Sequence, residues 1–316
     1  MGLDNTQLEV SKSIGKAEDL NRELLVPTTV CGCCGGDKFQ KLIPLFKDPD
    51  VNYIRCERCS AVTYDNIYSQ QGIDAIYQND DYYAEFQASG TSKVTFFGPE
   101  RIANHILKHI DLPSSPEKTV SILDFGGGDG QIACLLGKLL LDKRKCQKVE
   151  VVVVDYNESL YPVDDERISI SRVFPLDDVK SGFDIVIASA VIEHLPEPRS
   201  FLKMLFDAAK KDGFLYFRTP YVFPLFRLLR KFGVRYDTAF PQHIWDLGQD
   251  WWNRADSIIG YPSGKVKLIR SCPSIVEKSY RVDFFGALAA HIMKSVWYIT
   301  HKWQYVGGWE AIFRKS

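Results

Sequence analysis

The sequence predicts an α/β fold: a doubly wound domain with a parallel sheet, preceded by a small cysteine-rich unit. Three observations lead to this prediction. A glycine-rich turn stands between an apolar strand and an apolar helix. A β-branched strand with a carboxylate at its end follows it. Two C-x2-C pairs lie close together near the N-terminus, well before the glycine-rich turn.

The glycine-rich turn lies in Ser121-Ile-Leu-Asp-Phe-Gly-Gly-Gly-Asp-Gly130. The apolar run before it is typical of a short buried strand, and from Ile132 to Leu140 apolar residues recur at helical spacing. Strand, turn and helix open a doubly wound domain, in which ligands bind at the carboxyl ends of the strands. Because glycine lets a backbone approach a ligand closely, we expect a ligand to contact Asp124, Gly126, Gly128 and Gly130.

The next strand is Val149-Glu-Val-Val-Val-Val-Asp155. A carboxylate at its end can accept both hydroxyls of a ribose, which indicates a nucleoside-containing cofactor. From Gly128 the chain also satisfies G-x-G-x-x-A, so the pattern alone leaves a nicotinamide cofactor open.

Asp124 stands two residues before Gly126 and completes D-x-G-x-G-x-G, which resembles motif I of the class I S-adenosylmethionine (SAM) methyltransferases. Phe183-Asp-Ile-Val-Ile-Ala-Ser-Ala-Val-Ile-Glu-His-Leu-Pro196 resembles the FDxVxxxxxxEHL segment of that family. The resemblance implies a Rossmann-like fold with a seven-stranded, mostly parallel sheet. It also implies SAM as cofactor, with Asp124 holding the methionine ammonium directly or through water, and Asp155 holding the ribose. We expect Tyr156 to cover the adenine and Ser189 to line the cleft at the end of the fourth strand.

Five of the eight cysteines fall between positions 31 and 59. Cys31 with Cys34, and Cys56 with Cys59, form two C-x2-C turns at close to the spacing of four-cysteine zinc sites. Cys33 competes with Cys34, but only Cys34 gives the two-residue gap. Four thiolates leave no open position for catalysis, so we expect a structural zinc ion; a reduced, metal-free cluster is the alternative.

A zinc ribbon before a class I methyltransferase domain resembles a bacterial family that includes sugar C-methyltransferases. In that family, tyrosine-rich helical linkers lie near the active site, and Tyr77-Gln-Asn-Asp-Asp-Tyr-Tyr83 is similar to them. Tyr83 is therefore a candidate for lining the pocket, with simple packing as the alternative. We divide the chain into a flexible lead-in (1–26), a zinc ribbon (27–66), a helical linker (67–111) and the SAM-binding domain (112–316), with insertions at about 221–262 and 280–303.

The remaining elements follow from apolar periodicity and from Pro and Gly positions. We expect helices at 99–111, 201–209, 221–232 and 283–303, and strands at 167–172, 183–189, 213–220, 265–269 and 305–315. The last strand should be antiparallel, as in class I methyltransferases. The helix at 221–232 is basic and amphipathic, which makes it a candidate for peripheral membrane contact, with packing on a neighbouring element as the alternative.

Two histidines are candidates for the general base. His243, in Phe240-Pro-Gln-His243, resembles the active-site histidine of the sugar C-methyltransferases, and His194 is the second choice. An imidazole can accept a proton at neutral pH, although bracing a loop is the alternative role of each. Gln242 replaces the acid of that family and Phe240 replaces its tyrosine, so O-methylation is favoured over C-methylation.

Composition limits the remaining possibilities. With 39 basic and 40 acidic residues, nothing favours nucleic-acid binding, and with no signal peptide or apolar run of membrane length we expect a cytoplasmic protein. The resulting hypothesis is methyl transfer to a sugar acceptor, a nucleotide sugar or a glycan, in surface-polysaccharide or natural-product synthesis. A non-catalytic protein that binds SAM and zinc is the first alternative, and an NAD-dependent oxidoreductase the second.

Overall fold

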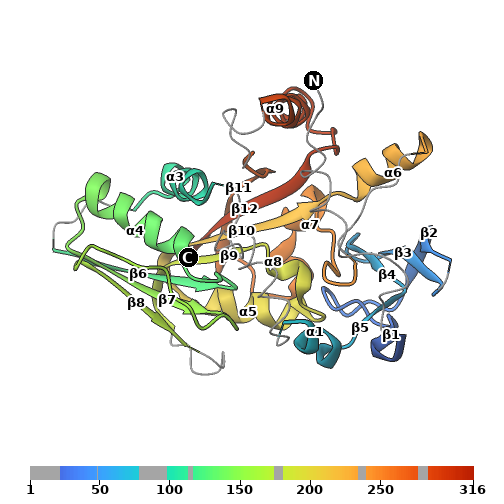
Figure 1. Cartoon of the computed structure of the whole chain (residues 1–316), viewed down its shortest axis with the longest axis horizontal. Helices are drawn as coiled ribbons and strands as arrows, with labels where there is room; N and C mark the ends of the chain where they lie inside the picture. The colour runs from blue at the N-terminus through green and yellow to red at the C-terminus, as the bar shows by residue number, and fades with distance from the viewer. Residues whose placement is uncertain are drawn as a thin grey trace, which may run out of the picture.

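The computed structural model describes residues 22–47, 49–77, 98–112, 117–173, 181–233, 240–276 and 284–316. A seven-stranded sheet with the order β11-β12-β10-β9-β6-β7-β8 forms its centre (Figure 1). Its strands are β6 (Thr119–Phe125), β7 (Lys148–Val154), β8 (Ile168–Arg172), β9 (Phe183–Ser189), β10 (Ala209–Tyr221), β11 (Val266–Pro273) and β12 (Gly307–Lys315). β12 is antiparallel to both of its neighbours. The predicted mostly parallel sheet, with an antiparallel last strand, is confirmed.

Helices cover both faces of this sheet, because successive strand residues point to opposite faces. Ile185 and Ile187 of β9 belong to the core that contains α3 (Pro99–His109) and α4 (Gln131–Arg144). Val186 and Ala188 belong to the core with α5 (Pro198–Ala208). In Figure 1, α3 and α4 lie on one side of the sheet and α5 on the other. The helix assigned to the linker is therefore part of the domain core.

The cysteine-rich unit is built on two small sheets. One contains β2 (Phe39–Phe46), β3 (Val51–Cys56) and β4 (Val62–Tyr64), and the other pairs β1 (Leu25–Pro27) with β5 (Asn66–Tyr68). The β1–β5 pair joins Leu25–Pro27 to Asn66–Tyr68, at the two ends of the segment expected to form the ribbon. A short 3-10 turn, Arg22–Leu24, precedes β1, and α1 (Gln70–Tyr77) follows β5. Most of the lead-in, and Tyr83, lie outside the described residues.

The C-terminal half adds four helices, whose bounds are α6 (Phe223–Lys231), α7 (Gln249–Trp252), α8 (Ala255–Ile259) and α9 (Phe284–Ile299). α6 buries Phe223 and Phe226 against the ring of Tyr53 in the cysteine-rich unit. Its apolar face is therefore occupied by packing, the alternative to membrane contact.

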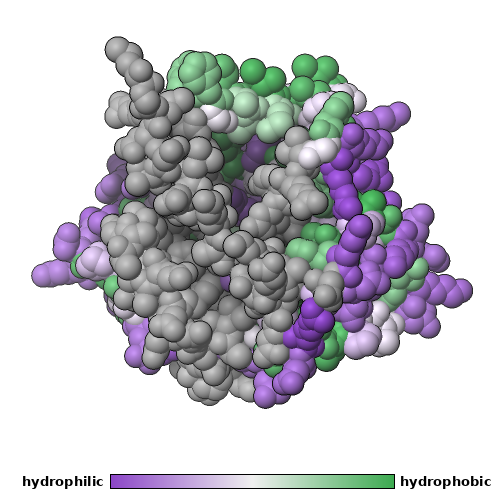
Figure 2. All heavy atoms as spheres, turned by 45° about the vertical axis from the view of Figure 1, so that its right-hand side comes forward, coloured by the Kyte–Doolittle hydropathy of each residue, from purple (hydrophilic) through white to green (hydrophobic). Residues whose placement is uncertain are grey.

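Apolar side chains are exposed on α9, among them Phe285, Leu288 and Ile292. Figure 2 shows apolar side chains gathered at the top of the molecule, where Figure 1 places α9. None of the described helices is long and apolar enough to span a membrane.

Candidate active site

The glycine turn joins β6 to α4 and is fixed to the neighbouring strand. The Gly126 N–H donates to the Val154 carbonyl at 2.8 Å. Gly126 has φ +65°, and a Cβ there would lie 2.4 Å from a methyl group of Val191. Gly130 has φ +83°, and its Cβ would lie 2.6 Å from Val153. The turn can adopt this course only with glycine at both positions.

Asp155 stands directly after β7 and organises the loops around it. Its Oδ2 accepts the Gly128 N–H at 2.8 Å, and its Oδ1 accepts the Asn157 N–H at 2.9 Å. A carboxylate has about four lone-pair positions, so even with a further backbone hydrogen bond from Tyr156 the Asp155 carboxylate keeps acceptor capacity for a ribose. The Tyr156 hydroxyl donates to Asp74 at 3.0 Å, which ties this loop to α1.

Asp124, at the end of β6, is only 2% exposed, and its Oδ2 has no hydrogen-bond partner among the described residues. Burial, and then the charges of Asp155 and Asp129, raise the pKa of Asp124 to about 7. A Cβ at Gly127 would lie 2.3 Å from the Asp124 carboxyl carbon, so this carboxyl group lies against the turn. Ser189 is also buried, and its Oγ likewise has no partner within the described part of the chain.

These groups form a site that fits SAM on chemical grounds. The ammonium of its methionine moiety would satisfy the orphaned Asp124 oxygen, because an unpaired buried polar atom costs about 1–3 kcal/mol. Its ribose hydroxyls suit the free acceptor positions of Asp155. The predicted residues Asp124, Gly126, Gly128, Gly130 and Asp155 come together at one edge of the sheet, where β6 and β7 end.

A second group of residues follows β9. A 3-10 turn, Ile192–His194, carries Glu193 and His194, and His243 comes from the loop before α7. Side-chain N and O atoms of these three residues lie within 4.8 Å of one another. The two imidazole rings meet edge to face, with centroids 4.8 Å apart. The structure thus brings together the two histidines that the sequence offered as alternatives.

Hydrogen bonding sets the orientation of His194. Its Nδ1 lies 3.0 Å from the Gln242 carbonyl oxygen, which can only accept, so Nδ1 carries the proton in the neutral ring. The ring also makes a backbone hydrogen bond with Ala190, and its Nε2 lies 3.9 Å from Glu193 Oε1. Two imidazoles and a carboxylate are also the ligand types of many divalent cations.

Burial keeps this cluster uncharged. It lowers the pKa of His243 to about 4. It also lowers the pKa of His194 to about 3, with a further contribution from His243. Burial raises the pKa of Glu193 to about 8, and neither of its carboxyl oxygens has a hydrogen-bond partner among the residues described. At pH 7 both imidazoles are therefore neutral and able to accept a proton.

The cluster lies next to the glycine turn. Val191, two residues before Glu193, fills the space that a side chain at Gly126 would occupy. β9 is also the direct neighbour of β6, with Ile187 opposite Asp124. The proton acceptors and the cofactor residues therefore share one carboxyl edge of the sheet.

Two residues at this site had no role in the sequence interpretation. Glu193 is fully buried beside both histidines, and the sequence marked it only as part of the EHL segment, with no role of its own. Asp246 accepts the N–H groups of Val222 at 2.7 Å and Phe223 at 2.9 Å and so holds the His243 loop against the start of α6. No sequence pattern connects residues that far apart.

The four predicted metal ligands converge at a separate site. Cys31 and Cys59 have their sulfur atoms 3.7 Å apart, and Cys34 and Cys56 3.5 Å apart. A tetrahedral zinc site with Zn–S bonds of about 2.3 Å has ligand separations of about 3.8 Å, so the donor set fits zinc. Hydrogen bonds from the thiols of Cys33 and Cys59 lower the pKa of Cys31. Cys33 therefore supports a ligand and stands outside the four-sulfur group.

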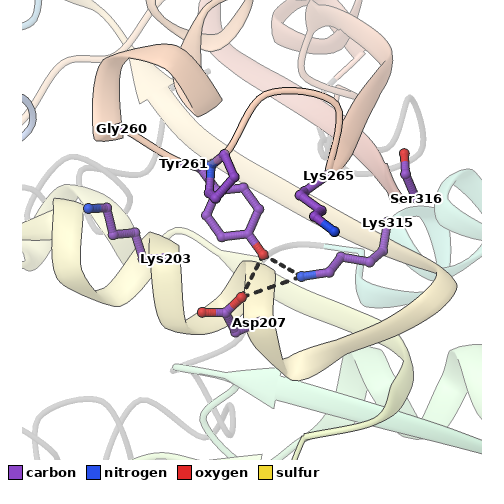
Figure 3. Close-up of a pocket in the computed structure, with 8 residues that line it drawn as sticks. Lys203, Asp207, Gly260, Tyr261, Lys265, Lys315 and Ser316 are labelled. Carbon is purple, nitrogen blue, oxygen red and sulfur yellow. Dashed lines mark hydrogen bonds and ion pairs between the residues drawn. The ribbon is translucent and has the colours of Figure 1, made fainter.

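A cavity of about 430 Å³ lies elsewhere, between α5, α8 and the C-terminus (Figure 3). Its tyrosine, Tyr261, donates to Asp207 at 2.6 Å, and Lys315 contacts the Tyr261 hydroxyl. Lys315 ends β12 opposite the beginning of β10, at the edge of the sheet away from Ser189. The cavity is therefore not part of the site described above.

Comparison with known proteins identifies the domain. The model of a methyltransferase domain family matches residues 83–257. The mitochondrial ubiquinone biosynthesis O-methyltransferase of Bos taurus is 31% identical over 113 residues, which cover 34% of this chain and 30% of that protein. The Homo sapiens protein of the same description is 30% identical over 145 residues, which cover 43% of this chain and 38% of that protein. The match thus spans less than two fifths of either relative.

Solved structures to which the chain is similar include the plantazolicin methyltransferase BpumL in complex with SAH, with a TM-score of 0.47 and 14% identity, covering 78% of this chain and 98% of that one. A SAM-dependent methyltransferase from Archaeoglobus fulgidus has a TM-score of 0.40 and 14% identity, covering 75% and 100%. The family match itself includes both the glycine turn and the Glu193–His194 segment. Because the methyltransferase domain model covers more than half of the chain, the protein belongs to the SAM-dependent methyltransferase family.

Proposed function

We propose that this protein transfers the methyl group of SAM to a hydroxyl oxygen of a small acceptor, with His243 as general base and His194 as the second candidate. The observation that carries the proposal is the pair of neutral, half-buried imidazoles beside the glycine turn. A base that is already unprotonated at pH 7 can take the acceptor proton without first losing its own.

Each residue has a distinct task in this mechanism. Bound SAM would supply an electrophilic methyl group on its sulfonium. Asp155 and the turn would fix the nucleoside, and Asp124 the ammonium. His243 would accept the hydroxyl proton as the oxygen attacks, while His194, held by the Gln242 carbonyl, supports the edge of the His243 ring. Much of the acceleration would come from holding methyl and oxygen in line.

The proposed acceptor is a sugar hydroxyl, on a nucleotide sugar or a glycan of surface-polysaccharide or natural-product synthesis. The resemblance around Tyr83 and His243 supports a sugar. Gln242 and Phe240, which replace an acid and a tyrosine, favour oxygen over carbon, and the relatives from cattle and human are described as O-methyltransferases. A phenolic acceptor is the competing outcome of the test.

We further propose that Cys31, Cys34, Cys56 and Cys59 hold one structural zinc ion. The sulfur separations support this. The small size of the cysteine-rich unit built on β1 to β5, from here on called the ribbon, also supports it, because units of this size usually need a metal or disulfides for stability. Since all four ligands are protein thiolates, the ion would have no position for an acceptor.

The first experiment is calorimetry with SAM, S-adenosylhomocysteine and NADH, using Asp155→Ala as control. SAM binding that is lost in the variant would identify the cofactor. Formation of S-adenosylhomocysteine with one member of a panel of nucleotide sugars, glycans and phenols would then identify the acceptor. SAM binding without turnover on any acceptor would favour a non-catalytic protein. Binding of NADH alone would contradict the proposal.

A further inference from the structure

The loop that carries His243, residues 240–247, is held between the methyltransferase domain and the ribbon. On the domain side, the N–H groups of Ile244 and Trp245 donate to the Glu193 carbonyl at 2.7 and 3.2 Å. The Trp245 indole N–H donates to the Leu195 carbonyl at 2.8 Å. These bonds attach the loop to the segment that carries His194.

On the ribbon side, the loop forms a β-bridge. The Asp246 N–H donates to the Val62 carbonyl at 2.9 Å, and the Val62 N–H donates to the Asp246 carbonyl at 3.3 Å. Val62 begins β4, three residues after the ligand Cys59. The Phe240 ring, at the other end of the loop, contacts Tyr64 and Phe46 of the ribbon, with centroids 4.6 and 5.8 Å apart.

The first cysteine turn also meets this region directly. Gly32 follows Cys31, and its carbonyl accepts the Arg199 N–H at 3.3 Å. A Cβ on Gly32 would lie 2.1 Å from the Pro196 carbonyl oxygen and 3.1 Å from the Trp245 ring. Only a residue without a side chain allows this approach. Both C-x2-C turns are therefore linked to the segments that carry His194 and His243.

We infer that the four-cysteine ribbon is a positioning element of the active site, which holds the 240–247 loop so that His243 stays against His194. This inference rests on the proposed function. Buried ribbon side chains such as Tyr53 and Tyr64 belong to the same core cluster as Phe240 and Trp245 of the loop. Because a four-thiolate metal usually fixes the shape of so small a unit, metal binding and loop position would be coupled. A displacement of about 1 Å at a reacting group can cost on the order of 100-fold in rate.

The test is Gly32→Ala in the full-length protein, since the added methyl separates the ribbon from Pro196 and Trp245 without removing a cysteine. The matched control is Glu57→Ala: Glu57 follows Cys56 as Gly32 follows Cys31, and its side chain is exposed. Zinc content, SAM affinity, kcat, KM and hydrogen exchange of the 240–247 loop are measured for each.

For Gly32→Ala we expect a full zinc complement and unchanged SAM affinity. We expect kcat to fall by about 10- to 100-fold, with amide exchange at Ile244–Asp246 faster by on the order of tenfold. Glu57→Ala should match the wild type in every measurement. A Gly32→Ala protein with wild-type kcat and loop exchange would overturn the inference, as would a loss of kcat fully explained by weaker SAM binding.

A second variant covers the case in which Gly32→Ala does not hold zinc. Phe46→Ala removes a half-buried ring from the Phe240 contact at a position outside both cysteine turns. We expect the same pattern, retained zinc with lower kcat and faster loop exchange, but smaller; no change in the loop would contradict the inference. If the wild type methylates nothing, the proposed function fails, while the exchange measurements still decide whether the ribbon holds the loop.

Discussion

Burial decides which form each ionisable side chain takes at the active site. Removing a charged group from water is costly, so buried acids keep their proton and buried histidines lose it. The pKa of His243 is lowered to about 4 and that of Glu193 is raised to about 8 by the same cause. His194 and His243 are therefore both unprotonated at neutral pH.

His243→Gln tests the general base. A side chain that cannot accept the acceptor proton should lower kcat by about 10²- to 10⁴-fold with little change in SAM affinity. In the wild type, kcat should stay level from neutral pH downward and fall only as the pH approaches about 4, where His243 takes up a proton. His301→Gln, at an exposed position, is the control and should show wild-type kinetics. An acid limb with a midpoint at 6.5 or above would contradict a buried base.

Asp124 should make SAM binding depend on pH. Its pKa is raised to about 7 without ligand, and only the ionised form can pair with the SAM ammonium. Affinity should therefore rise as the pH increases through 7, on the order of tenfold between pH 6 and 8. Asp124→Asn should weaken binding and remove the carboxyl contribution to this dependence, as measured by calorimetry.

Asp164→Asn, which changes an exposed carboxylate, is the control for the Asp124 variant and should keep the wild-type pH profile. If Asp124→Asn kept it as well, the ammonium would have another partner.

At the scale of elements, one buried carboxylate connects the 240–247 loop to α6. Asp246 accepts two backbone N–H groups at the beginning of this helix, groups that would otherwise be unsatisfied. Its backbone meanwhile pairs with β4. The loop, the helix and the ribbon strand are thus joined at a single residue.

Asp246→Ala should destabilise the fold by about 1–3 kcal/mol, because it leaves two N–H groups without an acceptor. Asp246→Asn keeps one acceptor oxygen and should lose less. Urea unfolding, followed by tryptophan fluorescence, measures both. Asp250→Ala changes an exposed carboxylate four residues further along the chain and should unfold at the wild-type midpoint. An equal loss of stability in this variant would show that Asp246 has no special role.

At the scale of the molecule, α6 packs on the ribbon, so membrane contact through 221–232 depends on what remains exposed. Phe232 is 77% exposed, and the basic residues Arg227, Arg230 and Lys231 precede it in α6. Each basic residue near an anionic surface contributes about 1 kcal/mol, so we expect weak, salt-sensitive co-sedimentation with anionic vesicles and none with neutral ones.

Phe232→Glu should abolish this sedimentation. Phe285→Glu, which changes an exposed side chain of α9, should leave it unchanged because we expect the contact at the end of α6. Equal binding to neutral and anionic vesicles would show that the basic residues of α6 do not drive the contact.

The sequence by itself determined the strands of the large sheet and the residues that gather at its carboxyl edge and at the four-cysteine group. Periodicity is local, so β9 falls on the expected residues Phe183–Ser189 and β7 ends directly before Asp155. Glycine turns and C-x2-C turns also act over a few residues. For that reason the cofactor edge of the sheet and the four-sulfur group could be predicted without coordinates.

Tertiary structure alone decided which distant groups meet. His105 of α3 pairs with Glu310 of the last strand, two residues that no local pattern connects. Glu193, His194 and His243 become one cluster only because the loop before α7 folds back over the end of β9. The ribbon reaches this loop through Val62 and Gly32. Such contacts depend on how whole elements pack, and local patterns of residues carry no record of that packing.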